Sequence, residues 1–135
     1  MPRPVVLILV AAALTFVLTG CLSGNSNKLT AQEKEALQAL FSSDQDLDNS
    51  TIQRLELPEE IAKKFPAVKK AFEITFGGQK LYAFHSSPLG YRSAIDLFTV
   101  IDGEKNEILG TRVLQHDETP LYGGDSLTKD WFLNR

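Results

Sequence analysis

The sequence predicts an α+β fold: two or three N-terminal helices packed on a small antiparallel sheet, with a short C-terminal helix closing the domain. Three observations support this prediction. Apolar residues recur at helical spacing up to residue 72, and from residue 74 onward they alternate with polar residues. An Asp-Gly pair separates two of the alternating segments, as is typical of a hairpin turn. The 135 residues leave room for one such domain.

The first helix is expected over residues 31 to 41. Thr30 begins the sequence TAQE, a capping-box pattern in which the Thr30 hydroxyl accepts from the Glu33 amide while the Glu33 side chain reaches back. Leu37, Leu40 and Phe41 then supply the apolar stripe of a helix that packs on a core.

The segment PEEIAKKFPAVKKAF, residues 58 to 72, also has helical character. Pro58 and the two glutamates after it suit a helix start, where the amides are free and the dipole is positive. The apolar residues at helical spacing are Ile61, Phe65, Val68 and Phe72. Pro66 must kink or divide such a helix, so one kinked helix and two short helices both remain open.

Alternating segments predict three strands, at residues 80 to 86, 91 to 102 and 106 to 116. The turn at Asp102-Gly103 joins the last two, so residues 93 to 101 should pair antiparallel with residues 107 to 115. The segment SLTKDWFL, residues 126 to 133, is expected to form the closing helix, with Ser126 as its N-cap and Trp131 in the core.

Residues 1 to 21 are expected to be an export signal. Arg3 gives a short positive region, and residues 5 to 18 form an uninterrupted apolar run. The sequence LTGC that follows ends at Cys21, the only cysteine of the chain, and resembles the lipobox of bacterial lipoproteins. That resemblance implies a diacylated Cys21, a tether over residues 22 to 29 and a folded domain over residues 30 to 135. The alternative is an uncleaved apolar helix over residues 5 to 22.

The expected location is the extracytoplasmic side of a bacterial membrane, with the lipid bilayer as a partner through Cys21. Leu22, which follows the cysteine, is not the aspartate associated with retention in the inner membrane. No other cysteine remains for a disulfide or a metal site. The formal net charge is −3 and there is no basic block, which excludes nucleic acid as a partner.

The acidic segment SSDQDLDNST, residues 42 to 51, is similar to a calcium-binding loop in its alternating aspartates. The similarity fails at two demanding positions, because Asn49 replaces the turn glycine and Leu55 replaces the bidentate glutamate. The segment is therefore expected to be a solvated loop without a metal.

The candidate site is the cluster HDETPLYGGD, residues 116 to 125, directly after the last predicted strand. His116 and Glu118 alternate and can face the same way, while Pro120 stiffens the exit from the sheet. Gly123 and Gly124 let the backbone approach a ligand closely. The alternative is a surface histidine beside a tight turn.

Motifs in residues 72 to 134 resemble the FMN-binding domain family, typified by the G subunit of the Rnf electron-transport complex and the C subunit of the sodium-pumping NADH:quinone reductase. That family has a GY-x-x-x-I segment, a turn, an I-x-G-x-x-V strand and then H-x-E-T-P, in this order. The matching residues are Gly90, Tyr91, Ile95, Ile108, Gly110, Val113, His116, Glu118, Thr119 and Pro120.

The resemblance implies a flavin site, with other membrane redox subunits as partners. His116 and the Thr119 backbone would donate to a flavin carbonyl, and Glu118 would fix His116 or accept from the ring N–H. Tyr91 would offer an aromatic face, or serve only as a sheet residue. The expected cofactor-binding residues are Tyr91, His116, Glu118, Thr119, Pro120, Leu121, Gly123 and Gly124. His85 is expected to have no role, because its strand offers no acidic neighbour.

Two departures from the family affect the expected function. The glycines after the proline are displaced by Tyr122. The Ser/Thr-Gly-Ala-Thr motif that carries FMN in the family is not found in these residues. Thr128 does not belong to such a motif and is expected to be a helix residue. The resemblance therefore implies a membrane-anchored electron-transfer flavoprotein module with FMN bound non-covalently or not at all. The alternative is a non-enzymatic lipoprotein that serves as an interaction module, or a truncated relative that holds no flavin.

Overall fold

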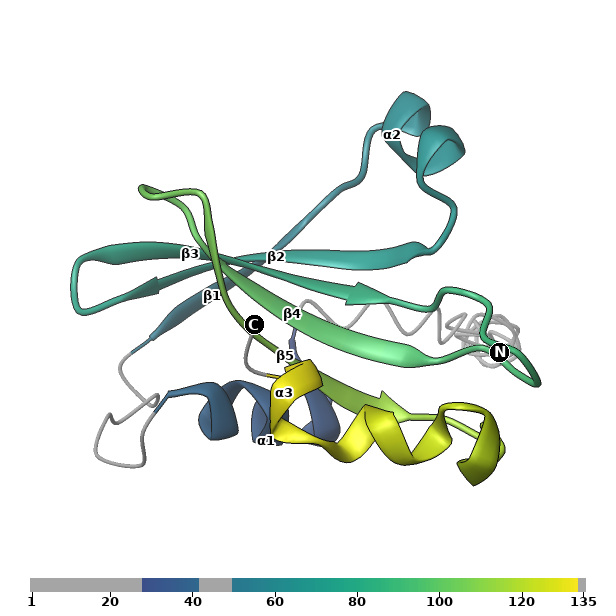
Figure 1. Cartoon of the computed structure of the whole chain (residues 1–135). Coiled ribbons are helices and arrows are strands. Elements are labelled where there is room, and N and C mark those ends of the chain that lie inside the picture. The colour runs from purple at the N-terminus through teal and green to yellow at the C-terminus, as the bar shows by residue number, and fades with distance from the viewer. Residues whose placement is uncertain (1–27, 42–49, 134–135) are drawn as a thin grey trace, which may run out of the picture.

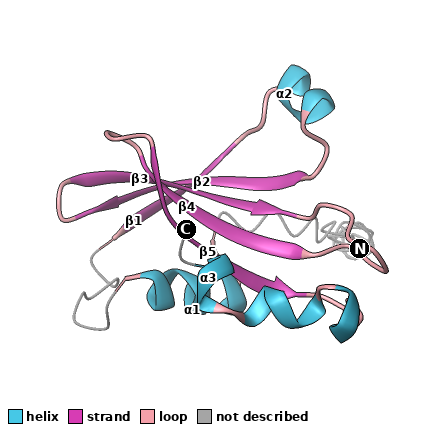
Figure 2. Cartoon of the chain, viewed as in Figure 1, coloured by secondary structure: helices cyan, strands magenta, loops and turns pink. Residues whose placement is uncertain are grey.

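The computed structural model describes residues 28–41 and 50–133, which form an antiparallel sheet with helices at its sides (Figures 1 and 2). Its elements are α1 (Ala31–Leu40), β1 (Thr51–Leu55), α2 (Glu59–Lys64), β2 (Val68–Phe76), β3 (Gln79–Ser86), β4 (Asp96–Asp102), β5 (Glu107–Gln115), the 3₁₀ helices η2 (Pro120–Tyr122) and η3 (Gly124–Thr128), and α3 (Asp130–Leu133). Within these described ranges the sheet has five strands in the order β1-β2-β3-β4-β5, with antiparallel neighbours throughout. The α+β class is confirmed, with strands contributing more of the fold than the sequence suggested.

Helix α1 covers one face of the sheet, and the core lies between them (Figure 1). Its Leu37 is fully buried against strand residues that include Phe72 and Phe98. The predicted capping box is present: the Glu33 amide donates to Thr30 Oγ1 at 3.2 Å, and the Thr30 amide donates to Glu33 Oε2 at 2.8 Å. The predicted helix is thus confirmed, ending one residue early.

The helical prediction for residues 58 to 72 is wrong beyond Lys64. After Pro66 the chain enters β2, whose Phe72 and Ile74 face the core while Gly77 and Gly78, with φ of 55° and 83°, turn it into β3. Val68 and Phe72 lie four residues apart, a spacing that places two residues on one face of a helix and also on one face of a strand. The spacing of apolar residues therefore does not distinguish a helix from a strand in this segment.

The arrangement of the N-terminal helices also differs from the prediction. Helix α2 projects away from the sheet, and its Ile61 and the following Phe65 are 40% and 48% exposed (Figure 1). In the described residues, α1 alone among the N-terminal helices packs on the sheet. Strand β1 was not expected, and its Ile52 pairs with Ile74 of β2. Residues 42–49, most of the predicted acidic loop, lie outside the described residues.

The hairpin of β4 and β5 is confirmed, with pairs from Asp96↔Gln115 to Asp102↔Glu107. Its turn is held by the Asp102 carboxylate, which accepts from the Glu104 and Lys105 amides at 2.9 and 3.0 Å. The predicted start of the strand at residue 91 is wrong, because residues 87 to 95 form a loop.

The C-terminal segment is helical, but not as one helix. Ser126 lies inside η3 rather than capping a helix, and Lys129, in an extended conformation, separates η3 from α3. The side chain of Trp131 lies outside the described part of the structure, as do Cys21 and the predicted signal and most of the tether. Among the described residues, none of the helices has the length and apolar character needed to cross a bilayer.

Candidate functional site

The motif residues come together at one end of the sheet. The loop of residues 87 to 95 leaves β3, and the segment of residues 116 to 124 follows β5. Because Asp96 at the start of β4 pairs with Gln115 at the end of β5, both segments lie at the same end (Figure 1). This places the GY motif beside the HxETP motif, as a shared site requires.

Glu118 joins the two segments. Its carboxylate is buried and accepts the backbone amides of Tyr91 at 3.0 Å, Arg92 at 3.1 Å and Ser93 at 2.9 Å. The Ser93 amide contributes most to lowering the pKa of Glu118 below its ordinary value, and the other two amides add to it against the opposing effect of burial. The residue is thus held ionised, with its acceptor atoms engaged by the loop.

We call the contact between the Glu118 carboxylate and the backbone amides of residues 91 to 93 the interlock. Two glycines leave room for it. A Cβ atom on Gly90 would lie 2.4 Å from Glu118 Oε1, and one on Gly124 would lie 2.7 Å from the Glu118 carbonyl oxygen. Gly124 is therefore buried against its own chain, whereas the exposed Gly123 turns the chain with a φ of 106°. The sequence predicted that both would approach a ligand, but the close approach of Gly124 is to Glu118.

His116 is half-buried next to this interlock. Its Nδ1 atom accepts the Glu118 amide at 3.3 Å, so the neutral ring carries its proton on Nε2, where it can donate to a ligand. The contact with Glu118 thus uses the amide rather than the carboxylate. Thr119 is half-buried, and Pro120 and Leu121 after it are exposed.

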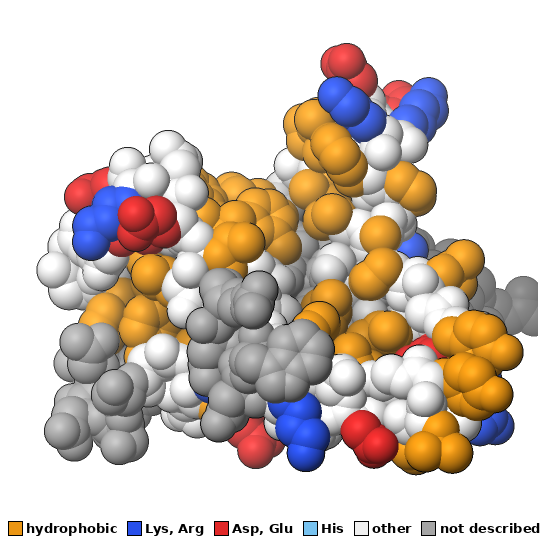
Figure 3. Space-filling view, in the orientation of Figure 1, with side chains coloured by type: hydrophobic (Ala, Val, Ile, Leu, Met, Phe, Trp, Pro, Cys, Tyr) orange, Lys and Arg blue, Asp and Glu red, His pale blue; other side chains and the backbone are white. Residues whose placement is uncertain are grey.

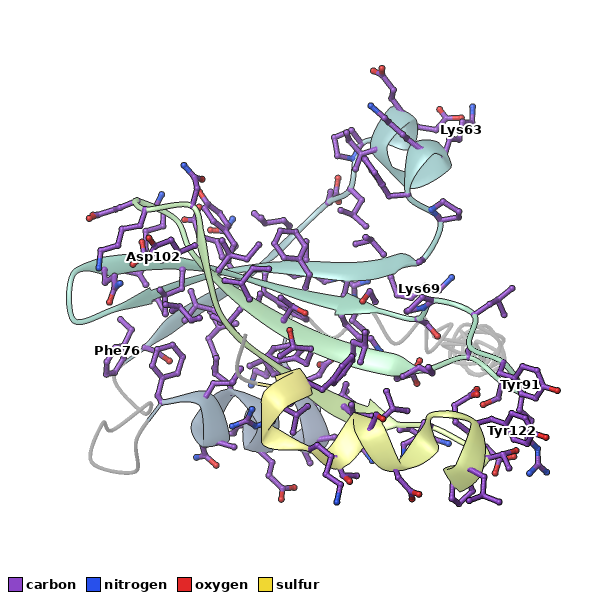
Figure 4. The ribbon with its side chains drawn as sticks, in the orientation of Figure 1. Lys63, Lys69, Phe76, Tyr91, Asp102 and Tyr122 are labelled. Carbon is purple, nitrogen blue, oxygen red and sulfur yellow. The ribbon has the colours of Figure 1, made fainter. Side chains whose placement is uncertain are left out.

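Aromatic and aliphatic side chains lie exposed at the same end. The rings of Tyr91 and Tyr122 stack with centroids 5.3 Å apart and planes 10° apart (Figure 4). They are 75% and 67% exposed, while Leu89 and Leu121 are 90% and 91% exposed. Figure 3 shows hydrophobic side chains gathered at this edge of the molecule. We call Leu89, Tyr91, Leu121 and Tyr122 the Tyr-Leu patch; Tyr122 was not among the predicted site residues.

A second polar cluster, which the sequence did not reveal, lies between α1 and the sheet. The buried Glu33 Oε1 lies 2.8 Å from Lys70 Nζ of β2 and 2.6 Å from His85 Nδ1 of β3. Burial alone would raise the pKa of Glu33, but hydrogen bonds from Lys70, the Thr30 amide and His85 lower it to about 2. His85 has no acidic neighbour in its own strand, but the carboxylate of Glu33 reaches it from α1, 52 positions earlier in the chain. The expectation that His85 has no functional role stays a prediction.

Two hollows of the described surface lie away from these loops. One of about 300 Å³ lies between α1 and β5, near Ala36 and Arg112, and one of about 670 Å³ lies along β1 and β2, near Arg54 and Lys69. No group of three potential metal ligands occurs in the described residues. A planar ligand stacked on Tyr91, which is 75% exposed, would lie on the surface of the domain.

Comparison with known proteins gives one group of relatives. The chain is 30% identical over 120 residues to the G subunit of an ion-translocating oxidoreductase complex from Haemophilus influenzae strain 86-028NP, covering 84% of this chain and 56% of the relative. It is 32% identical over 97 residues to the proteins of the same name from strains Rd and PittEE, covering 70% of this chain and 45% of each. No family model matches the chain, and no solved structure matches it significantly.

The aligned region is long enough to include most of the described fold. The chain spans about half the length of the curated relatives it matches, 56% and 45% in the comparisons above. The similarity supports the family resemblance carried by the motifs: over most of its length, this chain is similar to the G subunits of ion-translocating oxidoreductase complexes.

Proposed function

We propose that this chain is a lipid-anchored electron-transfer module of a membrane redox complex, binding FMN non-covalently on the loops at one end of its sheet. The observation that supports this proposal best is the interlock at Glu118. It joins the two motif segments and leaves His116 and the tyrosine rings at the surface. The similarity to the G subunits of ion-translocating oxidoreductase complexes supports the redox role.

In this proposal the flavin ring stacks on the outer face of Tyr91, the face that Tyr122 does not cover. Aromatic rings favour offset stacking on other planar systems, and the pairing with Tyr122 already fixes the Tyr91 ring. His116 Nε2 and the Thr119 backbone donate to a flavin carbonyl, which stabilises negative charge on the ring as it is reduced. Pro120, Leu121 and Gly123 border this surface.

Glu118 serves as a positioning residue in this arrangement. Its carboxylate is engaged by the amides of residues 91 to 93, so it holds Tyr91 in place instead of contacting the flavin. Gly124 contributes in the same way, because its lack of a side chain lets the chain close around the Glu118 backbone. The electron carrier is the flavin, and the protein tunes and orients it.

Titration of free FMN into the 135-residue chain tests the flavin site. A few hydrogen bonds at about 0.5 to 1.5 kcal/mol each must offset an association cost of at least roughly 4 kcal/mol, so we expect binding no tighter than a Kd in the high-micromolar to millimolar range. His116→Ala removes one such bond and should weaken binding by roughly threefold to tenfold. The readout is quenching of flavin fluorescence.

Lys105→Ala is the matched control, because Lys105 is an exposed residue in the turn at the opposite end of the sheet. It should bind FMN like the wild type. Equal affinity of the wild type and His116→Ala would remove the cluster from the site. Absence of any binding at several times the expected Kd would favour the second candidate, an interaction module without flavin, which the exposed Tyr-Leu patch supports.

The anchor is tested at Cys21. We expect Cys21→Ala to leave an unprocessed precursor and to abolish incorporation of labelled palmitate, because in the lipoproteins that this motif resembles the cysteine is acylated and the peptide bond before it is then cleaved. Inhibiting the lipoprotein signal peptidase in the wild type should give the same larger species on a denaturing gel. A mature product cleaved at normal efficiency from the alanine variant would contradict the anchor.

A further inference from the structure

We propose that the Tyr-Leu patch docks on the lipid bilayer, with its leucines entering the interfacial region and the hydroxyl ends of its stacked tyrosine rings at headgroup depth, which leaves the outer face of Tyr91 to the flavin. The proposal rests on the lipid anchor proposed for Cys21 and adds an orientation to it: the domain lies with one end of its sheet against the membrane. The partner is a phospholipid surface.

The exposure of the patch is the first argument. Leu89 and Leu121 are 90% and 91% exposed, although they lie on different segments that Glu118 brings together. Singly exposed leucines are common on protein surfaces, but four large exposed side chains at one end of the sheet, two of them stacked, indicate an interaction site. The fold holds these side chains out in water instead of packing them.

The composition of the patch is the second argument. Tyrosine is enriched at membrane interfaces, where its apolar ring and polar hydroxyl match the boundary between chains and headgroups. The stacking of Tyr91 on Tyr122 fixes both rings before docking, so little side-chain freedom remains to be lost. Leucines beside such a pair supply the apolar surface that enters the bilayer.

The direction of the chain is the third argument. Glu33, in the first turn of α1, contacts His85 near the end of β3, so α1 begins at the end of the sheet that carries the patch. It runs toward the other end, where Phe41 lies against Phe76. The chain before α1 therefore enters the domain at the patch end.

The anchor lies close to that entry point along the chain. Cys21 precedes Lys28, the first described residue, by seven positions. Seven residues span at most about 25 Å even when fully extended. Strand β5 has nine residues and extends roughly 30 Å away from that end. A bilayer holding Cys21 is thus within reach of the patch end, and the turn at residues 103 to 106 lies at the far end.

A probe of local polarity on the acylated full-length chain tests the proposal. Because acylated Cys21 has no free thiol, Leu121→Cys and the control Lys105→Cys each offer a single site for an environment-sensitive fluorophore. The proteins are reconstituted into vesicles of phosphatidylethanolamine and phosphatidylglycerol that carry nitroxide lipids. We expect the probe at residue 121 to be quenched at least about twofold by nitroxides near the headgroups, and the probe at residue 105 to be unaffected.

A second variant separates docking by the patch from insertion of the fluorophore itself. Adding Leu89→Asp to Leu121→Cys places a charge in the patch and should abolish most of the quenching. Unchanged quenching in that variant would overturn the proposal.

Flotation of the vesicles distinguishes the anchor from the docking. Protein that floats with the vesicles while both probes report water would overturn docking and leave the anchor intact, pointing to a protein partner for the patch. Protein that does not float would overturn the anchor and this proposal with it. Probe signals that depend on protein density instead of on nitroxide would overturn the proposal in favour of contact between two copies of the chain.

Discussion

Replacing Glu33 with glutamine should lower the free energy of unfolding at neutral pH by about 3 kcal/mol, because removing one partner of a buried ion pair leaves the other uncompensated. Glu33 is fully buried, and its Oε1 atom serves both Lys70 and His85. Lys70 is 26% exposed and can turn partly toward water, which places the effect at the lower end of the range for buried pairs.

The pH dependence of this effect follows from the lowered pKa of Glu33. The carboxylate titrates at about 2 in the folded chain against an ordinary value of 4.5, so the folded state favours the ionised form. A pKa difference of one corresponds to about 1.4 kcal/mol, giving about 3 kcal/mol in total. This stabilisation is complete above pH 4.5 and is lost as the pH falls from there through about 2.

Urea unfolding followed by circular dichroism between pH 7 and pH 2.5 measures both effects. The difference in stability between the wild type and Glu33→Gln should shrink steadily below pH 4.5. Glu35→Gln is the matched control, because Glu35 lies on the same helix and is exposed. A difference between wild type and Glu33→Gln that stays constant down to pH 2.5 would contradict the assigned ionisation.

Replacing Gly90 with alanine should destabilise the chain by about 1 to 3 kcal/mol and loosen the site, because the new methyl group has no room. It would lie 2.4 Å from Glu118 Oε1 and 2.8 Å from Ile95 Cδ1. Either the loop shifts or the carboxylate withdraws from the backbone amides it accepts. Amide hydrogen exchange at residues 91 to 93 should then become roughly tenfold faster.

Gly110→Ala is the control for Gly90→Ala. Its methyl group would meet Leu40 Cδ2 at 2.4 Å, but that atom ends a flexible side chain that can rotate away. The control should therefore cost less stability and leave exchange at residues 91 to 93 unchanged. Slow exchange at residues 91 to 93 in Gly90→Ala would show that the interlock does not depend on this glycine.

Local signals predicted the elements whose determinants are close in sequence. The capping box of Thr30 and Glu33 specified the start of α1, and the Asp102 turn specified the hairpin of β4 and β5. The strand after Pro66 was mistaken for a helix because Val68 and Phe72 fit both periods. Phe72 faces the core only through pairing with β3, and the spacing of apolar residues does not reveal such pairing.

The candidate site shows the same division between local and distant contacts. The cluster after β5 was found by its composition, and the family motifs placed Tyr91 beside it. The role of Glu118 could not be predicted, because its carboxylate accepts amides 25 to 27 residues earlier in the chain. The contact between Glu33 and His85 joins residues 52 positions apart, which no spacing pattern indicates.

The sequential strand order has a consequence for the kinetics of folding. Each strand pairs with the strand that precedes it in the chain, so the sheet can grow hairpin by hairpin with short loop closures. Helix α1 is the exception, since it comes first in the described chain and its Glu33 meets partners on β2 and β3. A chain that crosses a membrane from its N-terminus would expose the apolar face of α1 until those strands arrive. Docking of α1 joins residues that are far apart in sequence, so we expect it to be the step that limits the folding rate.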